Sequence, residues 1–202
     1  MTHFWIFLTA CLILAVTPGP GLLYVLARAV GNGREDGLRS AAGTFIGGMC
    51  HVVAASIGLS ALLAASAIAF SVVKYAGAGY LVFLGIRMLM TRNEGAGALV
   101  RVKPSGAVRQ GIWTEILNPK TALFFLSFIP QFVEPASGHA FLQFLILGSI
   151  SVTLNTAADV CVVVLSVPIA KRLGASAGFR RGQRTGSGIG MIGLGLYVAL
   201  HE

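Results

Sequence analysis

The chain has 202 residues and a formal net charge of +8, with 55% of its residues hydrophobic and only 11% charged. Soluble domains carry roughly 25% charged residues, so this composition, with a mean hydropathy of +0.81, excludes an ordinary soluble protein and indicates an integral membrane protein. Because the cations lie between long apolar runs, we expect a lipid bilayer as a partner and no nucleic acid.

The first apolar run, residues 4–27, has no charged side chain. It is long enough to cross a bilayer, which takes about 20 residues in a helix. Its centre carries the sequence TPGPG at residues 17–21. Proline breaks a helix interior because it lacks an N–H and clashes with the preceding turn. We therefore expect the first span to be interrupted inside the membrane.

The remaining apolar regions predict five more spans. Residues 40–86 are too long for one crossing and predict a hairpin of two spans, with its turn between residues 65 and 73. Residues 111–133, 140–170 and 185–200 predict one span each. The expected fold is therefore all-α, with six transmembrane helices.

Lys and Arg residues set the expected orientation, because short cytoplasmic loops are enriched in them. They cluster after the first, third and fifth spans, at Arg28, Arg34 and Arg39, at Arg87, Arg92, Arg101, Lys103 and Arg109, and at Lys171, Arg172, Arg180, Arg181 and Arg184. Both termini are therefore placed on the outer face. The two sets of three spans then run in opposite directions. This predicts a 3+3 inverted-topology repeat in one membrane domain, with halves at residues 1–92 and 110–202 and a cytoplasmic linker at residues 93–109.

The fourth span is interrupted as well, by Asn118, Pro119 and Lys120 in the sequence EILNPKTALFF, residues 115–125. A helix broken in lipid frees backbone groups, and such a break is tolerated only where protein or water surrounds it. Interrupted helices in matching positions of two inverted halves are the sequence signal of a substrate site at the midplane of a secondary transporter. A proline kink used only for packing is the alternative.

The two breaks give the candidate substrate-binding residues. They are Thr17, Pro18, Gly19, Pro20 and Gly21 in the first span and Asn118, Pro119 and Lys120 in the fourth.

Ionisable residues inside spans are costly and are functional candidates by default. Asp159 lies in the fifth span, with Asn155 one helical turn earlier. A carboxyl group removed from water can bind and release a proton at working pH, so Asp159 is the expected coupling residue. Lys120 is expected to be its counter-charge or to bind the carboxylate of a substrate. A purely structural pair of Asp159 and Lys120 is the alternative.

Glu115 and His51 are further coupling candidates. Glu115 lies about one turn inside the cytoplasmic end of its span, which fits either a site residue or a solvated position at the mouth. His51 can titrate near neutral pH, or it can form a hydrogen bond between helices. Cys11, Cys50 and Cys161 are isolated, and no nucleotide-binding motif is present, so we expect no metal site and no cofactor.

Small residues four apart, at Gly43 and Gly47 and again at Gly186 and Gly190, let helix backbones approach closely. The spacing favours helix packing, either within one chain or between the copies of a homo-oligomer.

Several of these segments resemble the LysE/RhtB superfamily of bacterial amino-acid exporters. They are TPGPG in the first span, GTFIG at residues 43–47, GAGYLVFLG in the third span and LNPKTALFFLSFIPQF in the fourth. The resemblance implies export from the cytoplasm across the bacterial inner (plasma) membrane of amino acids such as homoserine, threonine, leucine, lysine or arginine. It also implies that an ion gradient, commonly of protons, drives the export.

Two positions depart from the pattern of that superfamily. Gly21 stands where an Asn is usual, and Glu115 stands where a polar amide is usual three residues before Asn118. Both departures adjoin the breaks.

The sequence is compatible with three classes of function. The leading class is a proton-coupled secondary exporter of amino acids or related small zwitterions, and not an enzyme. An exporter of an inorganic cation with the same architecture is the alternative, although it would be expected to have more carboxylates at the midplane. A membrane-embedded enzyme or redox conduit is a third, and it lacks a recognisable motif.

Overall fold

A computed structural model of the chain describes residues 2–17, 19–90, 106–134 and 137–173 and, beyond these, Thr185, Ile189, Ile192, Gly193, Leu196 and Leu200. This part of the chain consists of helices and short connections and contains no strand, which confirms the all-α expectation for it. The predicted sixth span and most of the predicted linker lie outside the described residues, so the six-helix inverted repeat stays a prediction. The six described positions of the sixth span are helical.

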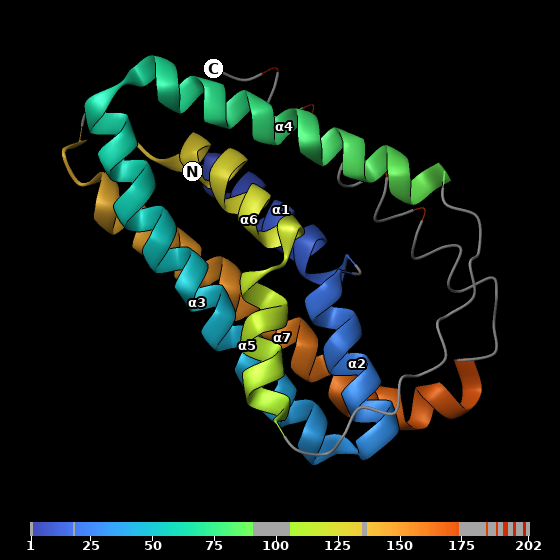
Figure 1. Cartoon of the computed structure of the whole chain (residues 1–202). Coiled ribbons are helices and arrows are strands. Elements are labelled where there is room, and N and C mark those ends of the chain that lie inside the picture. Colours follow the sequence, from blue (N-terminus) through green and yellow to red (C-terminus); the bar gives the residue numbers. More distant parts are fainter. Residues whose placement is uncertain are drawn as a thin grey trace.

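Figure 1 shows the helices in chain order, and residues 91–106 separate α4 from α5. They are α1 (Thr2–Val16), α2 (Pro20–Asn32), α3 (Arg34–Ala65), α4 (Ala67–Met90), α5 (Ala107–Ile116), α6 (Pro119–Ser127), the 3-10 helix η1 (Ile129–Phe132) and α7 (Ala140–Leu173).

Both predicted breaks are present. The first span divides into α1 and α2, whose axes differ by 47°. The fourth divides into α5 and α6, with Leu117 and Asn118 between them. Pro20 and Pro119 are each the first residue of the helix that follows the break. A proline fits there because the missing N–H would have no partner in the helix in any case.

The long apolar region after the first span forms the predicted hairpin. Ser66 alone separates α3 from α4, and it lies inside the range 65–73 expected for the turn. In Figure 1 this turn lies near the start of α7, while the junction of α2 and α3 lies at the opposite end of the molecule.

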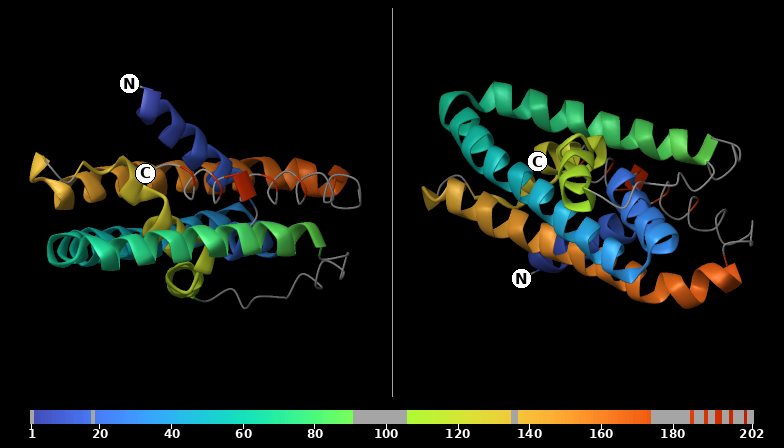
Figure 2. Two further views of the ribbon diagram at one scale, coloured as in Figure 1. Left: turned by 90° about the horizontal axis from the view of Figure 1, so that it is seen from above. Right: turned by 60° about the horizontal axis from the view of Figure 1, so that its bottom comes forward.

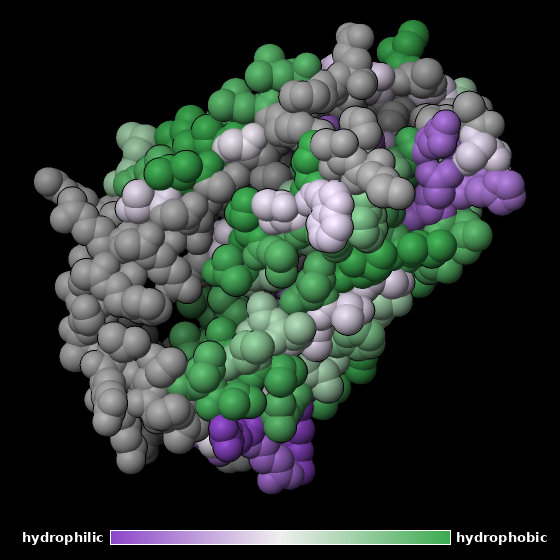
Figure 3. Space-filling model, turned by 180° about the vertical axis from the view of Figure 1, so that it is seen from behind, coloured by the Kyte–Doolittle hydropathy of each residue, from purple (hydrophilic) through white to green (hydrophobic). Residues whose placement is uncertain are grey.

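The described helices can cross a membrane at two or three places. The segments Arg34–Leu62 and Ala140–Leu165 are long and apolar enough to do so, and the bent pair of α1 and α2 adds a third if it counts as one span. On the face seen from behind, apolar side chains form a broad band and hydrophilic ones gather toward its ends (Figure 3). The surface and the helix lengths thus agree with a membrane protein.

The long helix α3 packs most extensively against α5 and α7, and Figure 2 shows α1 and α5 on opposite sides of these long helices. Glycines make the contact of α3 with α5 possible. A Cβ atom added at Gly43 would overlap the carbonyl of Val108 and lie 3.0 Å from the Cα of Gly111. The predicted packing role of Gly43 and Gly47 is therefore confirmed, within one chain.

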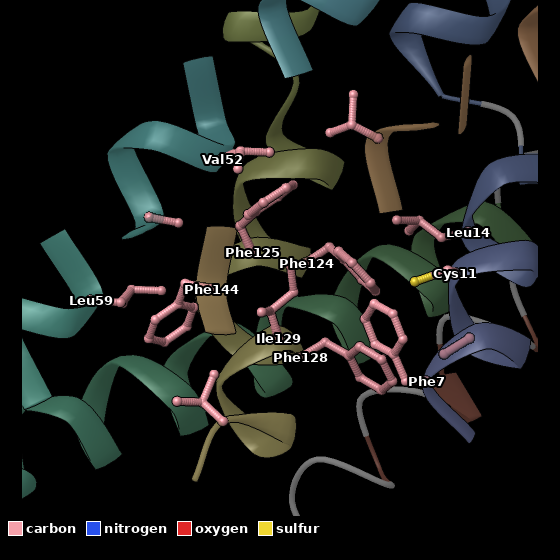
Figure 4. Packing of buried hydrophobic residues seen from close by; sticks show 14 of the residues in the cluster. Phe7, Cys11, Leu14, Val52, Leu59, Phe124, Phe125, Phe128, Ile129 and Phe144 are labelled. Atoms are coloured by element: carbon pink, nitrogen blue, oxygen red, sulfur yellow. The ribbon is translucent and has the colours of Figure 1, made fainter. Parts of the chain in front are cut away.

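Aromatic rings fill the core between α1, α6 and η1 (Figure 4). The rings of Phe124 and Phe128 stack at a centroid distance of 5.0 Å, and Phe7 meets Phe132 edge to face at 5.3 Å. These contacts join α1 to η1, which follows α6, and so help to position the two breaks relative to each other.

Candidate functional site

Buried polar side chains gather around the two breaks. They come from both broken spans and from α3 and α7, and each is at most 7% exposed: Thr17, Thr44, Glu115, Asn118, Lys120, Thr121 and Asp159. Polar groups buried at this density in a membrane protein are costly unless they bind one another or a ligand.

Lys120 links the two breaks directly. Its ammonium group donates to the carbonyl of Leu14, 3.1 Å away, and to that of Thr17, 2.9 Å away. Both carbonyls lie at the end of α1, where the break removes their regular helical donors, although the Leu14 carbonyl also accepts from the backbone N–H of Thr17 at 3.1 Å. In the part of the chain that the structure describes, Lys120 forms no ion pair with Asp159. It therefore caps α1 in this conformation.

The absence of a side chain at Gly19 leaves space for the Lys120 side chain. A Cβ atom at Gly19 would lie 3.0 Å from Cε and 3.1 Å from Nζ of Lys120, closer than such atoms normally approach. Pro18, the other predicted site residue of this loop, lies outside the described residues.

Asn118 organises the second break. Its side-chain oxygen accepts from the backbone N–H of Lys120 at 3.1 Å, as an N-cap does, while its Nδ2 donates to Oε2 of Glu115 at 3.1 Å. An N-cap of this kind satisfies an amide that the helix leaves free. Because one side chain makes both bonds, the start of α6 and the Glu115 carboxylate are held together.

Glu115 lies inside the cluster and not at a solvated mouth, since it is only 1% exposed. Besides the bond from Asn118, its Oε1 accepts from the Thr121 hydroxyl at 2.6 Å. Across the cluster, a Cβ atom added to Gly21 would overlap Oε2 of Glu115. The two positions that depart from the superfamily pattern are therefore in direct contact.

His51 forms the hydrogen bond between helices that was one of its two expected roles. Its Nε2 lies 3.0 Å from the backbone carbonyl of Glu115 at the end of α5. A carbonyl oxygen only accepts, so this nitrogen carries the proton. The ring also stacks on Phe125, with 6.1 Å between centroids. His51 therefore caps α5 as Lys120 caps α1.

Asp159 is buried on α7 beside this cluster. Its Oδ2 accepts from the hydroxyl of Thr44 at 2.9 Å, whereas its Oδ1 is buried and has no hydrogen-bond partner among the described residues. Asn155, one turn away, lines a small cavity together with Thr44, Glu115 and Thr121. The cavity volume is about 10 Å³, close to the space of one water molecule.

Sequence reasoning missed a second buried network, at the end of the molecule where α2 meets α3. Arg28, interpreted above as a loop cation, is 0% exposed. It donates to Asp36 at 2.9 Å and to Gln110 at 2.7 Å, and Tyr24 donates to the Ala107 carbonyl at 2.7 Å. The network ties α2 and α3 to α5. The spacing of Tyr24, Arg28 and Asn32, one every four residues on a helix, could have indicated it.

Membrane helices broken at a buried cluster of both charges are the architecture of a membrane transporter. The chain belongs to the LysE type translocator family, which it matches over residues 12–202. Membership of a translocator family indicates a transporter and not an enzyme.

Relatives agree with this assignment. An uncharacterized membrane protein of Pseudomonas aeruginosa is 34% identical, over 99% of this chain and 95% of its own length. The leucine efflux protein of Salmonella typhimurium is 33% identical, over 73% of this chain and 71% of its own length. An uncharacterized membrane protein of Vibrio cholerae is 33% identical over 76% of each chain. No solved structure matches the chain.

Proposed function

We propose that this protein is a secondary transporter that exports amino acids or related small zwitterions from the cytoplasm. The observation that carries the proposal is the bond of Lys120 in α6 to the carbonyls of Leu14 and Thr17 in α1. It brings two helix breaks together at one buried cluster, where freed backbone groups and charges of both signs can bind both ends of a zwitterion.

The choice of amino acids rests on family and relatives. The chain belongs to the LysE type translocator family, and several relatives about one third identical to it are named leucine efflux proteins. In this proposal the solute binds between Thr17, Pro18, Gly19, Pro20 and Gly21 on one side and Asn118, Pro119 and Lys120 on the other.

Proton coupling is assigned to Asp159. This carboxyl group is buried, and one of its oxygens has no partner among the described residues, as suits a group that gains and loses a proton during transport. Asn155 lies one turn away on the same helix, and Glu115 and His51 remain further candidates for the coupling route.

Access alternates by movement of residues 1–92 against residues 110–202, the two halves of the proposed inverted repeat, with residues 93–109 as the linker. A cavity of about 10 Å³ is too small for an amino acid, so one half must move for a solute to enter. The Arg28 network joins α2 and α3 to α5 and in this scheme closes the cytoplasmic end. The protein would lie in the bacterial inner membrane with both termini outside.

Counterflow in proteoliposomes tests the proposal. Vesicles are loaded in turn with threonine, leucine, lysine or a divalent metal ion, with and without an imposed pH gradient. We expect exchange of at least one amino acid, accelerated by the gradient. Exchange of the metal ion without any amino acid would show that the architecture serves an inorganic cation, and would overturn the proposed cargo.

A further inference from the structure

Gly21 and Glu115 occupy one shared space, although one begins α2 and the other lies near the end of α5. A Cβ atom at Gly21 would overlap Oε2 of Glu115 and lie 3.4 Å from its Cδ and 3.7 Å from a methyl group of Thr44. Any side chain at position 21 therefore displaces the carboxylate. The size of residue 21 decides whether the Glu115 carboxylate can occupy the place where Asn118 and Thr121 bind it.

The carboxylate held there is buried and forms no direct ion pair among the described residues, although the Lys120 ammonium group lies close enough to attract it. Glu115 accepts hydrogen bonds from two neutral side chains, Asn118 and Thr121. In the described part of the chain no Lys, Arg or His lies within ion-pair distance of it, because the ion pairs found are Arg28 with Asp36 and Arg39 with Glu35. A buried charge without a partner of opposite sign is strongly unfavourable.

Asp159 is a second buried carboxyl group whose hydrogen bonds are incomplete. It is 1% exposed, and its Oδ1 has no hydrogen-bond donor among the described residues. The one buried cation of the cluster, Lys120, is occupied by the Leu14 and Thr17 carbonyls. Glu115 lines a cavity that has room for about one group the size of water, and Asp159 is hydrogen-bonded to Thr44, which lines the same cavity.

We propose that Gly21 and Glu115 act together as a specificity determinant that recognises the ammonium group of the transported solute. The missing side chain at position 21 admits the Glu115 carboxylate, and that carboxylate binds a primary ammonium group, whose size fits the cavity. Solutes with a free ammonium group are then accepted, and solutes in which it is acylated are rejected. This inference rests on the proposed function, in which the cluster is the solute site.

A thermal-shift experiment on the purified protein separates the ammonium group from the rest of the solute. Leucine, threonine and lysine are each compared with their amides, which keep the ammonium group, and their N-acetyl forms, which lose it. We expect the amino acids and amides that bind to raise the Tm and the N-acetyl forms to leave it unchanged. Glu115→Gln, which keeps the shape and removes the charge, should weaken the binding at least about tenfold.

Three outcomes overturn the inference. They are an equal shift by an N-acetyl form, an undiminished shift in Glu115→Gln, and no shift by any ammonium compound. A shift by sodium or magnesium ions alone, without a shift by the ammonium compounds, overturns it too, because it assigns the carboxylates to an inorganic cation.

Counterflow distinguishes the failure of this inference from the failure of the proposed function. Transport of leucine and N-acetyl-leucine at equal rates would support the proposed exporter and contradict the proposed specificity determinant. Binding of ammonium compounds without transport would support the determinant and contradict the exporter.

A double-mutant cycle tests the contact itself. Gly21→Asn should lower the Tm and abolish ligand binding, and Glu115→Asn, with its shorter side chain, should relieve the overlap. We expect the double variant to recover the Tm but not the ammonium-dependent shift. Gly31→Asn is the matched control on α2, since a Cβ atom there meets nothing within 4 Å. If Gly21→Asn lowers the Tm equally in the wild-type protein and in the Glu115→Asn variant, the two positions act independently.

Discussion

The ammonium group of Lys120 donates to the carbonyl of Thr17 across 2.9 Å, so a cation from one broken helix caps the other broken helix. His51 does the equivalent at the second break, with its Nε2 3.0 Å from the carbonyl of Glu115. Each interruption is therefore satisfied by a side chain from elsewhere in the chain, as a break inside a membrane requires.

Replacing Lys120 tests this capping. Lys120→Met should lower the free energy of unfolding by about 2 kcal/mol, because the Thr17 carbonyl loses its donor and the Leu14 carbonyl loses one of its two donors, and counterflow should fail. Lys120→Arg should not restore transport, since a planar guanidinium cannot reproduce the two bonds that the ammonium group makes to the Leu14 and Thr17 carbonyls. Chemical denaturation and counterflow measure the two effects. A Met variant with wild-type stability would contradict the capping role.

The prolines of the first break should be needed for transport but not for insertion. In Pro18→Ala with Pro20→Ala the helix can continue through the break, and the Leu14 and Thr17 carbonyls then return to helical bonds, so Lys120 loses its partners. We expect normal amounts of membrane-inserted protein and no counterflow. Pro168→Ala on α7, outside the two breaks, serves as the control. Normal transport by the double variant would remove the unwound site from the mechanism.

Asp159→Asn should separate substrate exchange from proton drive. The amide keeps an oxygen for the Thr44 hydroxyl, 2.9 Å away in the native protein, but it cannot carry a proton. Exchange at equal pH should persist, and its acceleration by a pH gradient should disappear. Thr44→Val is the companion variant that removes the bond and keeps the carboxyl group. Gradient-driven efflux by Asp159→Asn at the native rate would assign coupling to another residue.

His51 is expected to act as a cap and not as a proton carrier. His51→Gln retains an N–H donor for the Glu115 carbonyl and should keep both transport and its dependence on the pH gradient. His51→Ala should lose about 1 kcal/mol of stability, the value of one hydrogen bond. Gradient dependence is read by counterflow at several values of pH. Its loss in His51→Gln would place the ring in the coupling route.

The buried ion pair of Arg28 and Asp36 offers a contrast with an exposed pair nearby. Arg28→Ala leaves the Asp36 carboxylate buried, so it should cost about 3–5 kcal/mol of stability. Arg39→Ala breaks a pair whose side chains are 61% and 81% exposed and should cost about 0–1 kcal/mol. Denaturation curves of both variants give the comparison. Equal effects would mean that Arg28 is solvated in the protein as it exists in a membrane.

Some of the fold could be predicted because it depends on local chemistry. Pro20 and Pro119 disfavour a helix interior, and with their neighbouring glycines or Asn118 they indicated where both breaks lie. The turn at Ser66 was found from length alone, since the apolar region exceeds one crossing.

The partners within the site could not be predicted, because they depend on which helices meet. Lys120 was expected to face Asp159 or a substrate, and its bonds to the carbonyls of α1 in this conformation were not expected. Arg28 was interpreted as a solvated loop cation, since the rule of positive cytoplasmic loops counts charges and not their burial. Gly21 and Glu115 each stood out, but nothing in the sequence indicated that they touch.

The bond from Lys120 to Leu14 joins residues 106 positions apart, which bears on how the protein is made. When the ribosome has completed α1 and α2, the Thr17 carbonyl at the end of α1 still lacks its donor, which belongs to α6. The amino-terminal half therefore enters the bilayer with its break unsealed, and it reaches its final packing only after α6 has been synthesised. Biogenesis has a fixed order, in which the later half completes the earlier one.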